Sequence, residues 1–206
     1  MSDAFEASGA ALARAQQALY RFGALAGAAG VQEGDLGAAG ELLRARILPL
    51  HPDPLVRHAW QQALAARPSG LALDRTRFDA PLFLERTLLR GRTDPTGALY
   101  ELCLRAGFRP SGTPDDLAVE LELAAELCAL EADAHERGDG ASLERALELR
   151  RELLEDHLVP WLPALREALE EAFPEAALLI GALAATCRFD WHRLCAALAD
   201  ATRREE

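Results

Sequence analysis

The sequence contains no lysine and no asparagine, and these two absences remove several functional classes. A chain without lysine has no phosphate-binding loop of the G-x-x-x-x-G-K-S/T type, and a chain without asparagine has no acceptor for N-glycosylation. The dinucleotide-binding pattern G-x-G-x-x-G and the zinc-protease pattern H-E-x-x-H are missing too. Because no common signature of catalysis is present, we expect a protein that is not an enzyme.

Long apolar runs and paired cysteines are also lacking. The longest uncharged apolar stretch of the C-terminal half, residues 176–187, is far shorter than the roughly 18 residues of a membrane span. The first residues include Asp3 and Glu6 and lack the basic start of a secretory signal. We therefore expect a cytoplasmic protein with no stable membrane insertion. No Cys-x-x-Cys pair occurs, and the four cysteines are expected to be buried thiols: Cys103, Cys128, Cys187 and Cys195.

Basic residues are the minority among the charges. The chain has 33 acidic residues against 22 arginines, a net charge of −11. This balance disfavours nucleic acid and anionic membrane surfaces and suits a basic partner, although a solvated acidic surface explains it equally. The 206 residues, half of them apolar, suffice for one domain with its own core. We expect a single domain over residues 1–206, with a hinge near 107–113 and a frayed tail at 201–206.

Helix-forming residues dominate the chain, β-branched residues are scarce, and no long stretch alternates with period two. Apolar residues recur at helical spacing over residues 7–26. Asp53 followed by Pro54 is typical of a helix start, and Gly107 of a helix end. Residues 70–96 are ambiguous, with a short helix expected from residue 79 to residue 89. The pattern predicts an all-α protein, a bundle of about eight to ten helices.

The sharpest predicted helix start is the segment at residues 113–116, with Thr113 as N-cap and Pro114 in the first helical position. The helix that follows should bury Leu117, Leu121, Ala124, Cys128 and Ala132, and keep Glu120, Glu122, Glu126 and Glu131 largely off this face. Ser142 is expected to cap the next helix, which runs to Leu158. The prolines at 160 and 163 should interrupt or kink the chain there, and a last helix should span residues 175–197, with a bend near Asp190.

Few polar residues have the spacing of a binding or metal site. Asp115 and Asp116, at an exposed helix start, can bind an arginine-bearing peptide, although acidic residues in a first turn also stabilise the helix dipole without further function. Trp161, between two prolines, fits a core position better than a ligand contact, and His157, one turn earlier, fits either. Two local groups, Glu131 with His135 and the cluster Cys187, Asp190, His192 and Cys195, lack the paired spacing of zinc ligands, so we expect no metal.

Two segments of the sequence resemble the motifs of one protein family. The sequence Thr-Pro-Asp-Asp-Leu-Ala-Val-Glu-Leu-Glu at residues 113–122, preceded by Ala-Gly-Phe at 106–108, resembles the P-D-H-L-x-x-E-L-E-F motif of the TorD/DmsD/NarJ redox-enzyme maturation chaperones. The sequence Asp-His-Leu-Val-Pro-Trp-Leu-Pro at 156–163 resembles the F-x-x-x-H-L-x-P-W-L-P motif of the same family. Ala-Leu-Tyr-Arg-Phe at 18–22 is similar to the opening L-Y-R-L. Asp116 stands where the family has histidine, and Leu123 where it has an aromatic residue.

The resemblance implies a TorD-like, all-helical, cytoplasmic chaperone without cofactor. Such a protein binds the catalytic-subunit precursor of a molybdopterin oxidoreductase, through a basic twin-arginine signal peptide or the N-terminus, and holds it for cofactor insertion. The peptide-binding residues would be Pro114, Asp115, Asp116, Tyr100, His157 and Trp161. No nucleic-acid partner is expected, and the protein would be a monomer or a homodimer. Two alternatives stay open: a non-catalytic helical adaptor or permanent subunit of a complex, and an enzyme with an unrecognised metal or thiol site.

Overall fold

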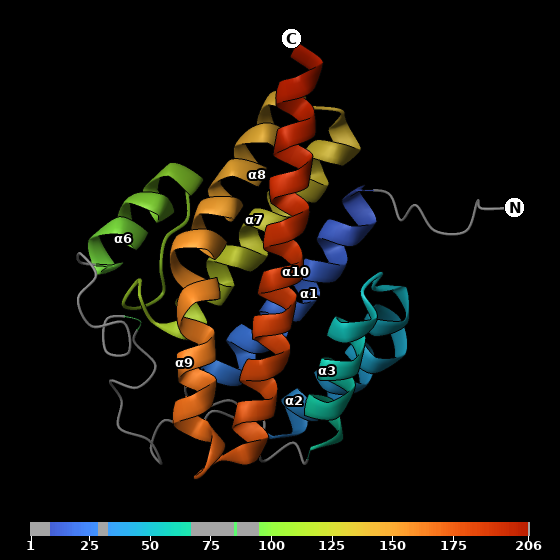
Figure 1. Cartoon of the computed structure of the whole chain (residues 1–206), viewed down its shortest axis with the longest axis vertical. Helices are drawn as coiled ribbons and strands as arrows, with labels where there is room; N and C mark the ends of the chain where they lie inside the picture. Colours follow the sequence, from blue (N-terminus) through green and yellow to red (C-terminus); the bar gives the residue numbers. More distant parts are fainter. Residues whose placement is uncertain (1–8, 29–32, 67–84, 86–94, 206) are drawn as a thin grey trace, which may run out of the picture.

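The computed structural model describes residues 9–28, 33–66, 85 and 95–205 (Figure 1). Every regular element within these ranges is helical, and the prediction of an all-α fold is confirmed. The short helix expected from residue 79 lies outside the described residues. The elements are α1 (Gly9–Gly27), α2 (Glu33–Leu42), the π-helical η1 (Leu43–Ile47), the 3-10 turn η2 (Leu48–Leu50), α3 (Pro54–Ala65), α6 (Pro95–Ala106), α7 (Leu117–Arg137), α8 (Gly140–Leu153), the π-helical η5 (Leu154–Leu158), α9 (Val159–Glu170) and α10 (Pro174–Glu205).

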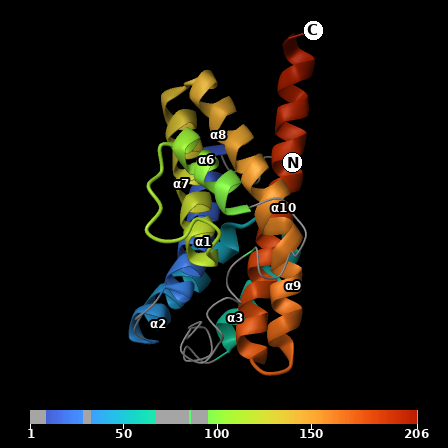
Figure 2. The same cartoon turned by 90° about the vertical axis from the view of Figure 1, so that its left-hand side faces the viewer.

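The helices pack in two groups. Helix α1 lies along α7, and the long helix α10 packs against α9 and α3. Helix α8 contacts both α7 and α10. Figure 2 shows α1 and α7 on one side, α9 and α10 on the other, and α8 beside both. An extended interior therefore lies between the two groups and receives side chains from both.

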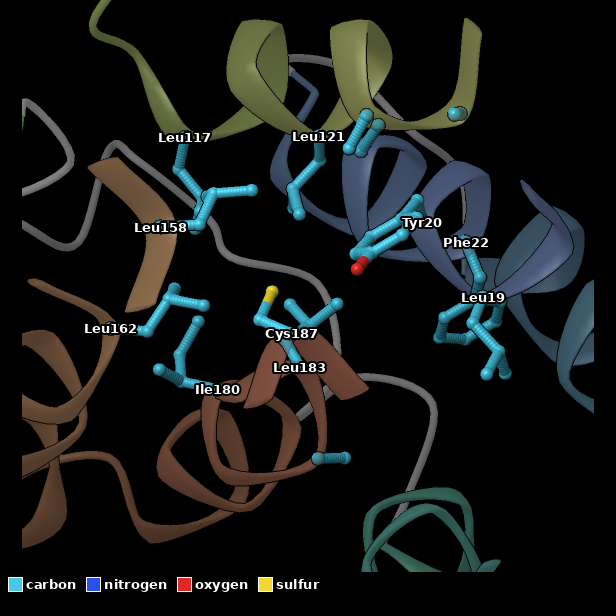
Figure 3. Packing of buried hydrophobic residues seen from close by; sticks show 14 of the residues in the cluster. Leu19, Tyr20, Phe22, Leu117, Leu121, Leu158, Leu162, Ile180, Leu183 and Cys187 are labelled. Carbon is cyan, nitrogen blue, oxygen red and sulfur yellow. The ribbon is translucent and has the colours of Figure 1, made fainter. Parts of the chain in front are cut away.

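Leucine side chains from several helices fill this interior (Figure 3). Leu121 of α7, Leu162 of α9 and Leu183 of α10 are all fully buried, and each contributes about 1.5–3 kcal/mol relative to an exposed position. Helix α1 approaches them closely at Gly23, where an added Cβ would lie 2.7 Å from Leu183 Cδ2. A side chain at this position would require the Leu183 methyl groups or the helices to shift, so glycine permits the close packing that is observed.

Helix ends confirm some of the predicted signals. Asp53 caps α3, and its Oδ1 accepts a hydrogen bond from Leu55 N at 2.6 Å. Gly107 follows α6 with φ of +70°, the left-handed conformation that a glycine C-cap adopts. Both signals are local, because a cap depends only on residues within one turn of the chain.

The predicted start of α7 is wrong by three residues. The helix begins at Leu117, and Asp116 is the N-cap, with Oδ1 accepting from Ala118 N at 3.0 Å. Thr113 starts a preceding turn instead, in which its carbonyl accepts from Asp116 N at 3.0 Å. An aspartate caps as well as a threonine, and only Asp116 directly precedes the apolar residues that the core buries. For the same reason Asp139, and not Ser142, caps α8.

The chain between α8 and α9 does not break at the prolines. The wider turns of η5 connect the two helices without a break, and both Pro160 and Pro163 lie within α9. Helix α10 continues through Asp190 to Glu205, farther than the predicted residue 197. None of the helices in the described ranges combines the length and low charge needed to cross a bilayer.

Candidate functional site

The two motif segments meet inside the molecule. Trp161 of α9 donates a hydrogen bond from its indole Nε1 to Glu120 Oε2 of α7 at 3.1 Å. Both side chains are fully buried. This contact joins the segment at residues 113–122 directly to the segment at residues 156–163. The two motifs therefore form one structural unit, although about 40 residues separate them.

A residue from a third part of the chain completes the unit. Glu85 is buried, and its Oε2 lies 2.7 Å from His157 Nδ1. Its backbone N–H donates to the carbonyl of Asp115 at 3.0 Å. Glu85 thus contacts both motif segments. We call these five residues, Glu85, Asp115, Glu120, His157 and Trp161, the motif junction.

Three carboxyl groups lie in this junction, those of Glu85, Asp115 and Glu120, and all three are at most 1% exposed. Burial, together with the nearby charge of Glu85, raises the pKa of Glu120 well above its ordinary value, while the hydrogen bond from Trp161 opposes the shift. Burial disfavours the ionised form because an apolar interior solvates a charge poorly. The junction therefore favours the neutral carboxylic acid of Glu120.

The predicted peptide-binding residues fall into two groups. Asp115 and Trp161 are fully buried, and His157 is 6% exposed. The expectation of two exposed carboxylates at a helix start is thus wrong for Asp115. Pro114 and Asp116 are half-buried, and Tyr100, on α6, is 52% exposed. The structure gathers Asp115, His157 and Trp161 at the motif junction, and it leaves the more exposed Asp116 and Tyr100 on separate elements.

Sequence reasoning missed Glu85 and the burial of Glu120. No pattern in the sequence marks Glu85. Glu120 follows Leu117 by three residues and precedes Ala124 by four, so the helical spacing itself places it on the buried side. Glu131 follows Cys128 by three residues and is fully buried for the same reason. The expectation that these two glutamates lie off the buried face is therefore wrong.

A second group of buried charges connects four helices. Arg150 of α8 is fully buried, and its Nη2 contacts Glu131 of α7 and lies 3.2 Å from Asp190 Oδ1 of α10. Arg193 reaches the same two carboxylates, with Nη1 at 2.9 Å from Glu131 Oε1. Tyr20 of α1 donates its hydroxyl to Asp190 Oδ2 at 3.1 Å. We call these residues, Tyr20, Glu131, Arg150, Asp190 and Arg193, the charge network.

Arg150 stays charged in this setting. Burial alone would lower its pKa, but the neighbouring Asp190, Cys128 and Glu131 raise the pKa above its ordinary value. Two guanidinium groups face two carboxylates, so the charges of the network balance. Balanced, hydrogen-bonded charges are the condition under which ionised groups are tolerated in a protein interior.

A groove of 630 Å³ opens beside the charge network, between α7, α8 and α10. Glu131, Glu144 and Asp200 contribute carboxylates to it, and Leu143 and Leu147 contribute apolar surface. His135 Nε2 lies 3.7 Å from Glu131 Oε1. Within the described part of the chain, no three metal-ligating side chains converge on one point. The groove combines charges of both signs with apolar walls, because Arg193 lines it too and pairs with Glu131.

The fold and the motif junction define an all-helical protein whose two family motifs pack into one buried unit. Residues 82–167 match the family model of the nitrate reductase delta subunit, and the resemblance to the chaperone family of NarJ and TorD is confirmed over this segment. Members of this family are chaperones for the maturation of molybdenum enzymes. The match contains every residue of the motif junction. Neither a search of the curated proteins nor a search of solved structures found a match.

Proposed function

We propose that this protein is a cytoplasmic chaperone, without catalytic activity, that binds the catalytic-subunit precursor of a molybdopterin oxidoreductase. It binds the twin-arginine signal peptide or N-terminus of the precursor and holds the subunit for cofactor insertion before assembly or export. The observation that carries the proposal is the family match over residues 82–167, because this segment holds both motifs and the junction that joins them.

Charge supports a basic peptide as the ligand. The net charge of −11 attracts an arginine-bearing segment over distances of about 10 Å at moderate salt. Of the predicted binding residues, Asp116 and Tyr100 keep accessible surface. Asp116 would pair with arginine, and Tyr100 would contact apolar side chains. The buried Asp115, His157 and Trp161 would act indirectly, by holding the turn at residues 113–116 in place.

A charge-neutral N-cap substitution tests the role of Asp116. Asp116→Asn removes the charge but keeps the cap of α7, since asparagine caps as well as aspartate. We expect binding of a labelled peptide with two adjacent arginines and an apolar segment to weaken about two- to fivefold, the effect of one exposed ion pair. Asp53→Asn, at the N-cap of α3, is the matched control and should leave binding unchanged. If Asp116→Asn binds the peptide as tightly as Asp53→Asn does, Asp116 caps the helix and does not contact the peptide.

Affinity capture from the native host tests the function itself. Recovery of an immature molybdenum-enzyme catalytic subunit, identified by mass spectrometry with its signal peptide intact, would support the chaperone. Recovery only of a mature, cofactor-loaded complex would favour a permanent subunit or adaptor, and would contradict the proposal. A chaperone releases its client after maturation, whereas a subunit remains bound.

A further inference from the structure

A groove of 340 Å³ lies between the end of α6 and the antiparallel pair of α7 and α8, and no residue of the motif junction lines it. Three arginines surround it, Arg105 of α6, Arg137 of α7 and Arg145 of α8. Its floor is apolar and is formed by Leu130, Ala146 and Leu149. None of the described residues that line it is acidic. We call it the arginine groove.

The three guanidinium groups have N–H donors beyond those used in their contacts within the protein. Arg145 Nη2 donates to the carbonyl of Arg105 at 2.6 Å, and Arg137 Nη1 lies 4.0 Å from Asp133 Oδ2. Arg105 contacts Glu152. The side chains of Arg105 and Arg137 are 50% and 59% exposed. Because each guanidinium carries five N–H donors in a planar fork, these contacts leave N–H groups available to carboxylates of a ligand.

The charge of the arginine groove is opposite to that of the molecule. The whole chain carries a net charge of −11. Glu152 and Asp133, which lie outside the lining, offset part of the charge of Arg105 and Arg137, but the lining itself holds three arginines and no acidic residue, so it is locally positive on an acidic protein. Such a site repels the basic peptide of the proposed function and attracts carboxylates.

Apolar surface continues to the edge of the groove on α6. Leu104, at its edge, is 62% exposed. A small anion would use the arginines and leave this apolar surface in water. A polypeptide segment with acidic and apolar side chains uses both.

We propose that the arginine groove binds an acidic, partly apolar segment of a polypeptide partner. Carboxylates of the segment pair with Arg105, Arg137 and Arg145, and a leucine-sized side chain lies on the floor formed by Leu130, Ala146 and Leu149. The groove is thus a second docking surface, with a chemistry distinct from that of the basic precursor peptide, and it lets the chaperone hold two segments at once. This inference does not depend on the identity of the client.

Fluorescence anisotropy of a labelled peptide tests the proposal. The probe is a short peptide of alternating glutamate and leucine, added to the full-length protein. We expect binding that weakens as salt is raised, and a loss of about tenfold in affinity for Arg137→Glu, because attraction by one charge becomes repulsion. Arg188→Glu, an exposed arginine on α10, makes the same change of charge elsewhere and should alter affinity less than about twofold.

One further variant of the protein and one altered peptide test the result independently. Arg145→Gln retains a side-chain donor for the carbonyl of Arg105 and should also weaken binding, while circular dichroism confirms the helical fold. A peptide with serine in place of leucine should bind less tightly, because it cannot use the apolar floor. The proposal is overturned if the glutamate–leucine peptide does not bind, or if Arg137→Glu and Arg188→Glu behave alike. Equal binding of the serine peptide, with displacement by inorganic phosphate, would instead show a site for small anions and would also overturn it.

Discussion

Glu120 carries a carboxyl group that is fully buried and receives one hydrogen bond, from Trp161. The raised pKa means that the folded protein holds this proton more tightly than the unfolded chain does. The group therefore adds stability that is fully present below its ordinary pKa of 4.5 and is lost as the pH rises through the raised value. The contribution of Glu120 to stability is thus largest in acidic solution and falls as the pH rises.

Glu120→Gln should remove this pH dependence. Glutamine keeps the oxygen that accepts from Trp161 and cannot ionise, so the variant should gain stability relative to the wild type as the pH rises. Urea unfolding at several pH values between about 5 and 9 measures the difference in unfolding free energy between the variant and the wild type. This range lies above the ordinary pKa of a glutamate, where a raised pKa takes effect. Glu126→Gln removes a half-buried carboxylate from the same helix and is the control. If the two variants show the same pH slope, Glu120 does not titrate in this range.

At the scale of elements, the connection from α7 to α8 depends on one backbone conformation. Gly138 adopts φ of +65°, and its N–H donates to the carbonyls of Ala134 and His135 at the end of α7. Asp139 follows at once as the N-cap of α8. The chain therefore reverses direction within two residues. This tight turn packs α8 alongside α7, and both helices contribute residues to the arginine groove.

Gly138→Ala should destabilise the protein by about 1 kcal/mol, because residues with a Cβ are disfavoured in the left-handed region. Gly140→Ala is the matched control. An added Cβ there meets nothing within 4 Å, and the position is helical, so alanine should be neutral or slightly stabilising. Thermal or urea unfolding measures both. An equal loss in the two variants would contradict the assignment of the effect to the positive φ.

At the scale of the whole molecule, the charge network ties α1, α7, α8 and α10 together. These helices come from both ends of the chain, so the network forms only when the complete bundle has assembled. Removing one partner leaves the others buried without their counter-charge, which is more costly than the loss of the attraction itself.

Arg150→Met should therefore lower the free energy of unfolding by about 3–5 kcal/mol, since Glu131 and Asp190 would keep only Arg193. The next residue supplies the control. Arg151 is 40% exposed and pairs with Glu155 one turn away, so Arg151→Met should change stability by less than about 0.5 kcal/mol. Equilibrium unfolding in urea compares the two. Similar losses for both arginines would show that the buried network adds nothing specific.

Local signals in the sequence were sufficient for the fold class and for the helix ends that depend on one turn of chain. The all-α fold follows from composition, the cap at Asp53 from its position before Pro54, and the resemblance to the chaperone family over residues 82–167 from two short motifs. The start of α7 was misplaced because Thr113 and Asp116 are equally good caps. Their choice depends on where burial of the apolar face begins, and burial is not a local property.

The sequence by itself determined the class of element, the motifs and the overall charge, because these follow from residue type and from spacing along one helix. Only the tertiary structure decided which partners the buried polar residues meet. Glu120 and Glu131 share one helix with glutamates that are half-buried or exposed, and α9 and α8 bring Trp161 and Arg150 to them. Such pairing depends on contacts between segments about 20 to 40 residues apart, whose partners no local pattern specifies. The motif junction and the charge network exist for this reason only in the folded chain.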